Sequence, residues 1–196
     1  MTPILKSSDD MNTEQIIDIF NVLFRVSHET ILEHSEGEPL YIPKSVDSPL
    51  NSIKFSHGFF SSALHEISHW LIAGKERRTQ KDLGYWYKPD GRSKDDQILF
   101  CKYETKNQGL EWLLSLACGM KFHVSSDNLS GEIDAVQSLN REFAREVRVH
   151  AKKFIKIGFS PRAENLINTL LNNFGTKDLY YSQIALICDD QLLPDY

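Results

Sequence analysis

Two histidines four residues apart, with a glutamate directly after the first, form the strongest chemical pattern in this sequence. They are His65 and His69, in the segment His-Glu-Ile-Ser-His. On a helix, residues four apart lie on the same face, one turn above the other, so both imidazoles can bind one ion. With seven histidines in 196 residues, chance gives this pattern in only about 2% of such chains. The spacing therefore predicts a metal site on a helix.

A metal site with two histidines needs at least one more ligand from elsewhere in the chain. The first choice is Glu111, because it interrupts the apolar segment Leu110–Leu114, and a carboxylate beside a buried face must be paired or bound to metal. Glu104 is the second choice. His123 and Asp134 are further candidates. If Glu111 instead faces solvent, it needs no metal.

Two histidines and a carboxylate fit two kinds of metal chemistry. With zinc, the set is that of a peptidase or amidase, and Glu66 is the general base that acts on bound water. With iron(II), the same set is the facial triad of oxygenases, which leaves positions open for dioxygen and substrate. The helical pattern alone favours the peptidase. A third interpretation is a non-catalytic adaptor whose structural metal has a closed, four-ligand site.

The histidine pair must be held by a helix, and the sequence predicts one over residues 59–73. Apolar residues recur there at helical spacing, and Gly74 is suited to end the helix. The predicted buried face consists of Phe60, Leu64, Ile67, Leu71 and Ile72.

The remaining elements make the predicted fold an α-rich α+β class with a small β component. Further helices are expected over residues 13–26, 108–119, 135–156 and 160–175, with a shorter segment over 93–100. Strands are expected at 53–58 and 120–124, while 35–51 looks irregular because of its prolines and glycine. The apolar stretch 182–188 is expected to pack without an assigned element. We expect residues 1–196 to form a single domain around the metal-binding helix.

Composition limits the classes of protein to which the chain can belong. The net charge of −5 argues against broad nucleic-acid binding. Cys101, Cys118 and Cys188 have no zinc-knuckle or redox spacing, so free thiols in a reducing compartment are expected. The sequence shows no secretion signal and no apolar run that could span a bilayer. These observations predict a cytoplasmic protein without a membrane or direct nucleic-acid partner.

Three segments together resemble the bacterial elongation factor P hydroxylase family. They are ALHEISHWLIAG around the histidine pair, GYWYKPDGRS after it, and the later QGLEW. The histidine motif alone is unspecific, but its combination with the aromatic turn and the LEW segment at this spacing is much more specific. The resemblance extends over most of the chain and is densest from residue 55 to 120.

The resemblance implies a cytoplasmic oxidoreductase of monooxygenase type. Its partner would be translation elongation factor P, on which it would hydroxylate a lysine that has already received a β-lysyl group. The family's metal centre has two histidines and a carboxylate, which fall by motif match on His65, His69 and either Glu111 or Glu104. Iron(II) with dioxygen as co-substrate is then favoured, with zinc as the alternative. Glu66 would orient a ligand or a water.

A substrate side chain that is a long cation calls for an acidic, aromatic-walled entrance. Tyr85, Trp86 and Tyr87 could supply walls and cation–π contact, with Asp90 nearby. Ordinary packing of a loop is the alternative for these residues.

Two groups of basic residues could dock an acidic protein partner. Lys75, Arg77 and Arg78 directly follow the metal helix, and Arg145 and Arg148 lie on a basic stripe of the helix predicted over 135–156. For the stripe, a merely solvated helix face is the alternative.

Overall fold

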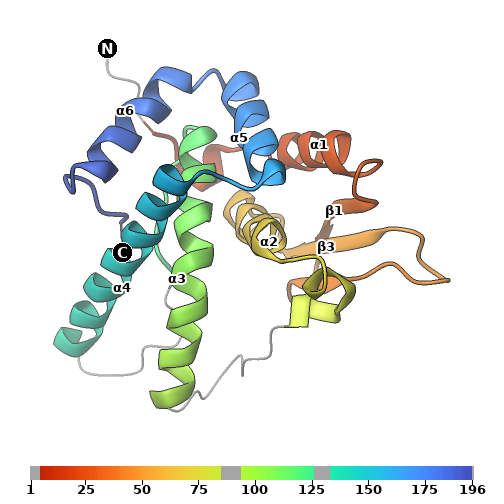
Figure 1. Ribbon diagram of the computed structural model, residues 1–196, viewed down its shortest axis with the longest axis horizontal. Helices are drawn as coiled ribbons and strands as arrows, with labels where there is room; N and C mark the ends of the chain where they lie inside the picture. Colours follow the sequence, from red (N-terminus) through yellow and green to blue (C-terminus); the bar gives the residue numbers. More distant parts are fainter. Residues whose placement is uncertain (1–4, 85–93, 126–132, 196) are drawn as a thin grey trace.

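The computed structural model describes residues 5–84, 94–125 and 133–195, and gives their side chains except at 94–99 and 133–140. Within these ranges the chain forms six α-helices and one three-stranded sheet (Figure 1). Helices predominate, so the predicted α-rich α+β class is confirmed. Among these helices, none combines the length and the apolar character needed to cross a bilayer.

The small sheet has the order β1 (Thr30–Ser35), β3 (Asn51–Ser56), β2 (Leu40–Ile42). β3 runs parallel to β1 and antiparallel to β2. The strand predicted at 53–58 is confirmed as β3, but β1 was not predicted. The expectation that 35–51 is irregular was wrong over β2. The prolines on both sides of β2 cannot donate a backbone hydrogen bond to a neighbouring strand. They limit β2 to three residues, which is too short for an alternating pattern to predict a strand.

Helix α2 (Phe60–Ile72) confirms the helix predicted over 59–73. It packs between the sheet and helix α3 (Figure 1), and its predicted apolar face is buried apart from the partly exposed Ile72 at its end. Trp70 is also fully buried. Its ring lies 5.3 Å from that of Phe20 and 5.0 Å from that of Phe24.

Those two phenylalanines belong to helix α1 (Thr13–Phe24), the helix predicted over 13–26. The side chain of Asn12 caps it by accepting from the backbone N–H of Glu14 at 3.0 Å. This contact satisfies one of the free N–H groups of the first turn.

Helix α3 (Lys94–Ala117) is continuous, whereas the sequence predicted two separate segments, 93–100 and 108–119. The prediction was wrong because the middle of the helix is polar and shows no apolar periodicity. Yet several of these polar residues are buried in the fold: Glu104, Thr105, Asn107 and Gln108. Tertiary contacts, rather than local periodicity, therefore stabilise this stretch as a helix. Its buried polar residues lie at the site described below.

The C-terminal third consists of α4 (Ile133–Ile157), α5 (Pro161–Phe174) and α6 (Lys177–Cys188). The first two confirm the helices predicted over 135–156 and 160–175. The N-cap Ser160 accepts from Ala163 N–H at 3.4 Å, and Gly175 ends α5 in the left-handed region at φ 64°. The apolar stretch 182–188 is the later half of α6.

The strand predicted over 120–124 is not formed. Met120 and His123 make only isolated bridges, to Lys6 and Asp195. Each bridge pairs a single residue with one chain end, so no ladder extends along the segment.

All three cysteines are free, as predicted. Cys118 is buried, and burial raises the pKa of its thiol. Cys188 is exposed.

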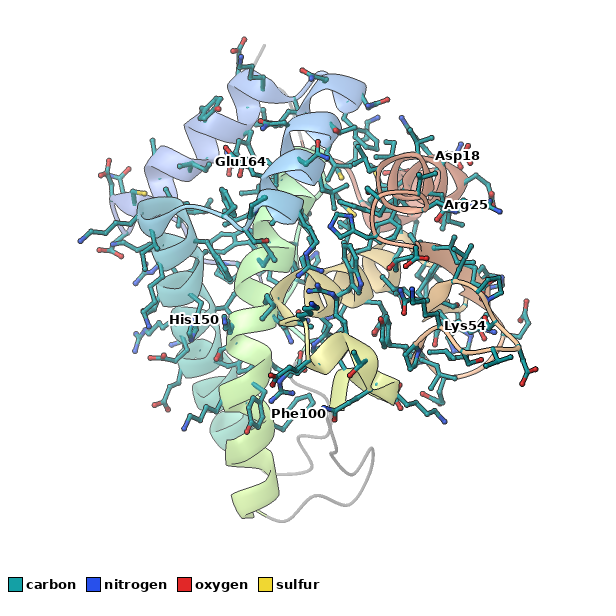
Figure 2. All side chains as sticks on the ribbon, turned by 45° about the vertical axis from the view of Figure 1, so that its right-hand side comes forward. Asp18, Arg25, Lys54, Phe100, His150 and Glu164 are labelled. Carbon is teal, nitrogen blue, oxygen red and sulfur yellow. The ribbon has the colours of Figure 1, made fainter. Side chains whose placement is uncertain are left out.

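Gly109 lets α3 and α4 approach closely. A Cβ added there would lie 2.8 Å from His150 Cβ, 3.0 Å from Ala151 N and 3.1 Å from Val147 O, and Figure 2 shows His150 beside α3. We expect Gly109→Ala to lower the free energy of unfolding by about 1–2 kcal/mol, because the overpacking cost exceeds the gain in helix propensity. Urea denaturation measures this.

Gly74→Ala is the matched control, since nothing lies within 4 Å of a Cβ there. Equal stability of the two alanine variants would contradict the close contact of α3 with α4.

Candidate metal centre

Helix α2 places His65 and His69 one turn apart with their imidazoles facing each other. Their Nε2 atoms are 3.2 Å apart, and the ring centroids are 4.9 Å apart. His69 is buried, while 27% of the His65 side chain is exposed. Two lone pairs at this separation repel each other unless a proton or a cation lies between them. The four-residue spacing has thus produced the convergence that the sequence predicted.

Glu104 of α3 brings a carboxylate to the same point. Its Oε1 lies 3.3 Å from His69 Nε2, and its Oε2 lies 3.5 Å from His65 Nε2. Only 1% of the Glu104 side chain is exposed, so the carboxylate is held here away from water. One ligand atom from each of these three residues lies within 4.8 Å of the others, the only such group found in the described part of the chain. Two imidazoles and a carboxylate suit iron(II) or zinc.

Glu111 meets the same histidine from the other side of the ring. Its Oε2 lies 2.8 Å from His65 Nδ1, the nitrogen that faces away from Glu104. A carboxylate that accepts from Nδ1–H fixes the tautomer and the ring orientation, and leaves Nε2 as the unprotonated nitrogen. Glu111 is buried and paired, as its place in an apolar segment predicts. Glu104, and not Glu111, therefore lies beside the Nε2 atoms of both histidines.

The charges of the cluster determine its protonation. Burial lowers the pKa of His65, but the carboxylates of Glu111, Glu104 and Glu66 outweigh burial and raise it to about 10. Burial raises the pKa of the Glu66 carboxyl; His65 and His69 oppose this rise, and Glu104 and Glu111 add to it. Glu104 and Glu111 therefore stabilise a positive charge at the histidine pair, carried by a proton on His65 or, in place of that proton, by a metal ion. Such a cluster attracts a cation.

Sequence reasoning missed Asn107, which supports the same ring. It is buried, and its Nδ2 lies 3.5 Å from both the backbone carbonyl oxygen and Nδ1 of His65. Its Oδ1 is buried without a hydrogen-bond partner. Asn107 stands three residues after Glu104 and four before Glu111, so all three share one face of α3. That spacing was the signal that could have found it.

Arginines hold the C-terminal end of α2, directly after the histidine pair. Arg162 of α5 donates to the carbonyl oxygens of Trp70, Leu71 and Ala73 at 3.0, 3.2 and 2.9 Å. Its guanidinium carbon also lies 4.4 Å from the centroid of the Trp70 ring. Arg78 donates to Ala73 O at 2.6 Å. These cations satisfy carbonyls that have no partner within the helix, at the negative end of its dipole.

Five basic residues were predicted to dock a partner: Lys75, Arg77, Arg78, Arg145 and Arg148. The structure separates them. Arg148 pairs with Asp190 of the same chain, donating to its backbone carbonyl at 3.1 Å and lying 3.4 Å from its carboxylate. Arg78 donates to the carbonyl oxygen of Ala73 at the end of α2. Arg77 donates to Leu83 O at 3.3 Å, while Lys75 and Arg145 are exposed.

Other predicted residues are not part of this group of three. His123 is exposed and bridges to Asp195. The side chain of Asp134 lies outside the described residues, as do four residues predicted to line the substrate entrance: Tyr85, Trp86, Tyr87 and Asp90.

Comparisons with known proteins cover the segment of the chain that holds the candidate centre. The family model described as elongation factor P hydroxylase matches residues 19–184, which include every residue of the candidate centre. A protein of Haemophilus influenzae, the elongation factor P lysine hydroxylase, is 45% identical over 165 residues. The aligned region covers 84% of this chain and 90% of that relative.

Proposed function

The chain belongs to the elongation factor P hydroxylase family, and we propose that it hydroxylates a lysine of translation elongation factor P. In this proposal the lysine already carries a β-lysyl group. The family match and the name of the Haemophilus influenzae relative support the reaction and the partner. Because the substrate is a translation factor, we place the enzyme in the cytoplasm.

The observation that carries the proposal is the convergence of His65, His69 and Glu104, with ligand atoms within 4.8 Å of one another. We assign these three residues as the metal ligands. Insertion of oxygen requires a metal with accessible redox states, and zinc has none. Iron(II) is therefore preferred to zinc, and when bound it would supply the one-electron chemistry that lets dioxygen react with a C–H bond. The hydrolytic alternative does not fit the reaction for which the relative is named.

The other residues of the cluster orient the ligands and hold protons. Glu111 accepts from Nδ1–H of His65, which keeps Nε2 of that ring available on the side of Glu104. Asn107 Nδ2 approaches the backbone carbonyl of His65 and steadies the same turn of α2. Glu66 holds a carboxyl with a raised pKa beside the pair, suited to orient a ligand or a water.

The test is mass spectrometry of β-lysylated elongation factor P after incubation in air with the purified chain, iron(II) and an excess of a reductant such as ascorbate, which supplies the two electrons that reduce the second oxygen atom to water. We expect the modified lysine to gain the mass of one oxygen atom. Elongation factor P without the β-lysyl group, and zinc in place of iron, are the controls and should show no gain. A folded, iron-loaded chain that adds no oxygen would exclude the proposed function.

A charge change at Arg145 tests the docking proposal. Arg145→Glu should raise the KM for elongation factor P by about 3- to 10-fold at low salt and leave kcat unchanged, because an exposed charge steers association. Arg148→Glu should instead lower thermal stability, since it places a glutamate opposite Asp190. Unchanged KM in Arg145→Glu would show that this face is merely solvated.

A further inference from the structure

Gln108 is a buried polar residue of α3 with two hydrogen bonds to one distant backbone unit. Only 1% of it is exposed. Its Nε2 donates to the carbonyl oxygen of Ser125 at 2.6 Å, and the backbone N–H of Ser125 donates to its Oε1 at 3.0 Å. The side-chain amide thus pairs with both polar groups of a single residue, as the backbone of a neighbouring strand does. A buried amide without partners destabilises a fold, so these two bonds allow Gln108 to lie inside.

Residues 119–125 run back along α3 in the opposite direction. Three contacts mark this course, at successively earlier levels of the helix: Met120 N to Ser115 O at 2.9 Å, Phe122 to Trp112 with ring centroids 6.2 Å apart, and Ser125 to Gln108. The segment is also fixed to both ends of the chain, because Lys121 N–H donates to Lys6 O at 2.9 Å and Val124 N–H donates to Asp195 O at 2.8 Å. Of the three contacts with α3, the one at Gln108 is nearest along the helix to Glu104.

Gln108 stands one helical turn from each of the two acids that meet the histidine pair. It follows Glu104 by four residues and precedes Glu111 by three, so the three side chains share one side of α3. A rotation of α3 by about 10° would move a side-chain atom by about 1 Å, since a helix with its side chains has a radius of about 5–6 Å. Metal–ligand distances tolerate deviations of only about 0.2 Å. The two acids therefore require α3 to be fixed in rotation at their own level.

Two hydrogen bonds from one amide are suited to fix that rotation. Apolar contacts along a helix are non-directional, whereas hydrogen bonds depend steeply on angle as well as on distance. We infer that Gln108 is a positioning residue: its hydrogen bonds to Ser125 fix the rotation of α3 that places both acids at the histidine pair. In its assignment of the metal ligands, this inference rests on the proposed function.

Helix α1 offers a matched control. The amide of Asn21 makes the same pair of bonds with the backbone of Leu32, donating to its carbonyl oxygen at 3.2 Å and accepting from its N–H at 2.8 Å. It joins α1 to β1, and neither element carries a residue of the candidate centre. Asn21→Leu and Gln108→Met therefore each remove one such pair while nearly keeping the size of the side chain. A purely structural role of Gln108 predicts the same consequences for both variants.

The test is a titration of the metal-free full chain and of the two variants with cobalt(II), whose visible absorption depends on its coordination geometry. Both variants should lower the melting temperature of the metal-free chain. Gln108→Met should also weaken cobalt affinity by about 10-fold, as does the loss of other groups that orient metal ligands, and should change the absorption spectrum of the cobalt-loaded chain. Asn21→Leu should leave cobalt affinity and spectrum unchanged. Gln108→Asn, which keeps the amide but shortens its reach, should change both in the same direction as Gln108→Met.

Unchanged cobalt affinity and spectrum in Gln108→Met would overturn the inference, and so would equal changes in Asn21→Leu. If Gln108→Met does not fold, Gln108→Asn takes its place in the same comparison. Failure of the proposed function is a different result. An unmodified chain that binds cobalt but, when loaded with iron, adds no oxygen to elongation factor P is not the hydroxylase, and the cobalt comparison still decides the role of Gln108.

Discussion

Replacing Glu104 with glutamine is expected to abolish tight metal binding and hydroxylation together. The amide keeps the size of the side chain and its place in α3 but removes the charge between two Nε2 atoms, which lie 3.3 and 3.5 Å from the carboxylate oxygens. A neutral amide oxygen is a much poorer ligand for a divalent ion in a buried site. The metal content of the purified variant and the oxygen gain on elongation factor P measure the two effects.

Glu111→Gln is the matched variant, seven residues later on the same helix face. Its carboxylate meets Nδ1 of His65, so we expect it to act through the orientation and basicity of that ring. Loss of such a partner typically weakens metal affinity or activity by about 10- to 100-fold. The variant should therefore still bind metal when metal is supplied in excess, whereas Glu104→Gln should not.

The reverse outcome would reassign the ligand. If Glu104→Gln retained metal and Glu111→Gln lost it, Glu111 would be the third ligand, as the sequence first favoured. If both variants bound metal as the unmodified chain does, neither acid would belong to the centre.

Arg162→Met is expected to lower the free energy of unfolding by about 2–4 kcal/mol and to weaken metal binding as well. The methionine fills part of the space over Trp70 but leaves the carbonyl oxygens of Trp70 and Leu71 without their donor, and Ala73 O keeps only Arg78. The last turn of α2 would then fray, and His69 stands in that turn. Chemical denaturation and a metal titration of the folded variant measure the two effects separately.

Arg162→Lys separates charge from geometry. It keeps a cation near the helix end but cannot donate to three carbonyls in a fork, so we expect an intermediate loss. Arg145→Met, at an exposed position, is the control for general loss of an arginine. If Arg162→Met were as stable as that control, the contacts at the end of α2 would not contribute to stability.

Local periodicity was enough to predict the helix and the histidine pair. The apolar spacing from Phe60 to Leu71 and the four-residue separation of His65 and His69 are properties of one helix, and they do not depend on what packs against it. The same holds for α1 and α5, whose caps and apolar faces lie within their own segments, and for the apolar spacing of α4. The family resemblance was likewise visible in contiguous segments of sequence.

The middle of α3 could not be predicted in this way. Glu104 was only the second choice of ligand because nothing in this polar stretch predicts that Glu104 and Asn107 are buried; the packing of α3 against α2 and α4 buries them. Arg162 lies almost one hundred residues from the carbonyls that it caps, and no local pattern connects them.

The sequence by itself determined that a helix presents two imidazoles to one point, because helix geometry relates residues four apart. Only the tertiary structure decided which acid reaches that point. Glu104 and Glu111 lie two turns apart on one face of α3, and the crossing of α3 over α2 puts the first beside both Nε2 atoms and the second behind His65. The position of α3 depends on packing between distant segments, including its close approach to α4 at Gly109, and such packing has no periodic pattern in the sequence.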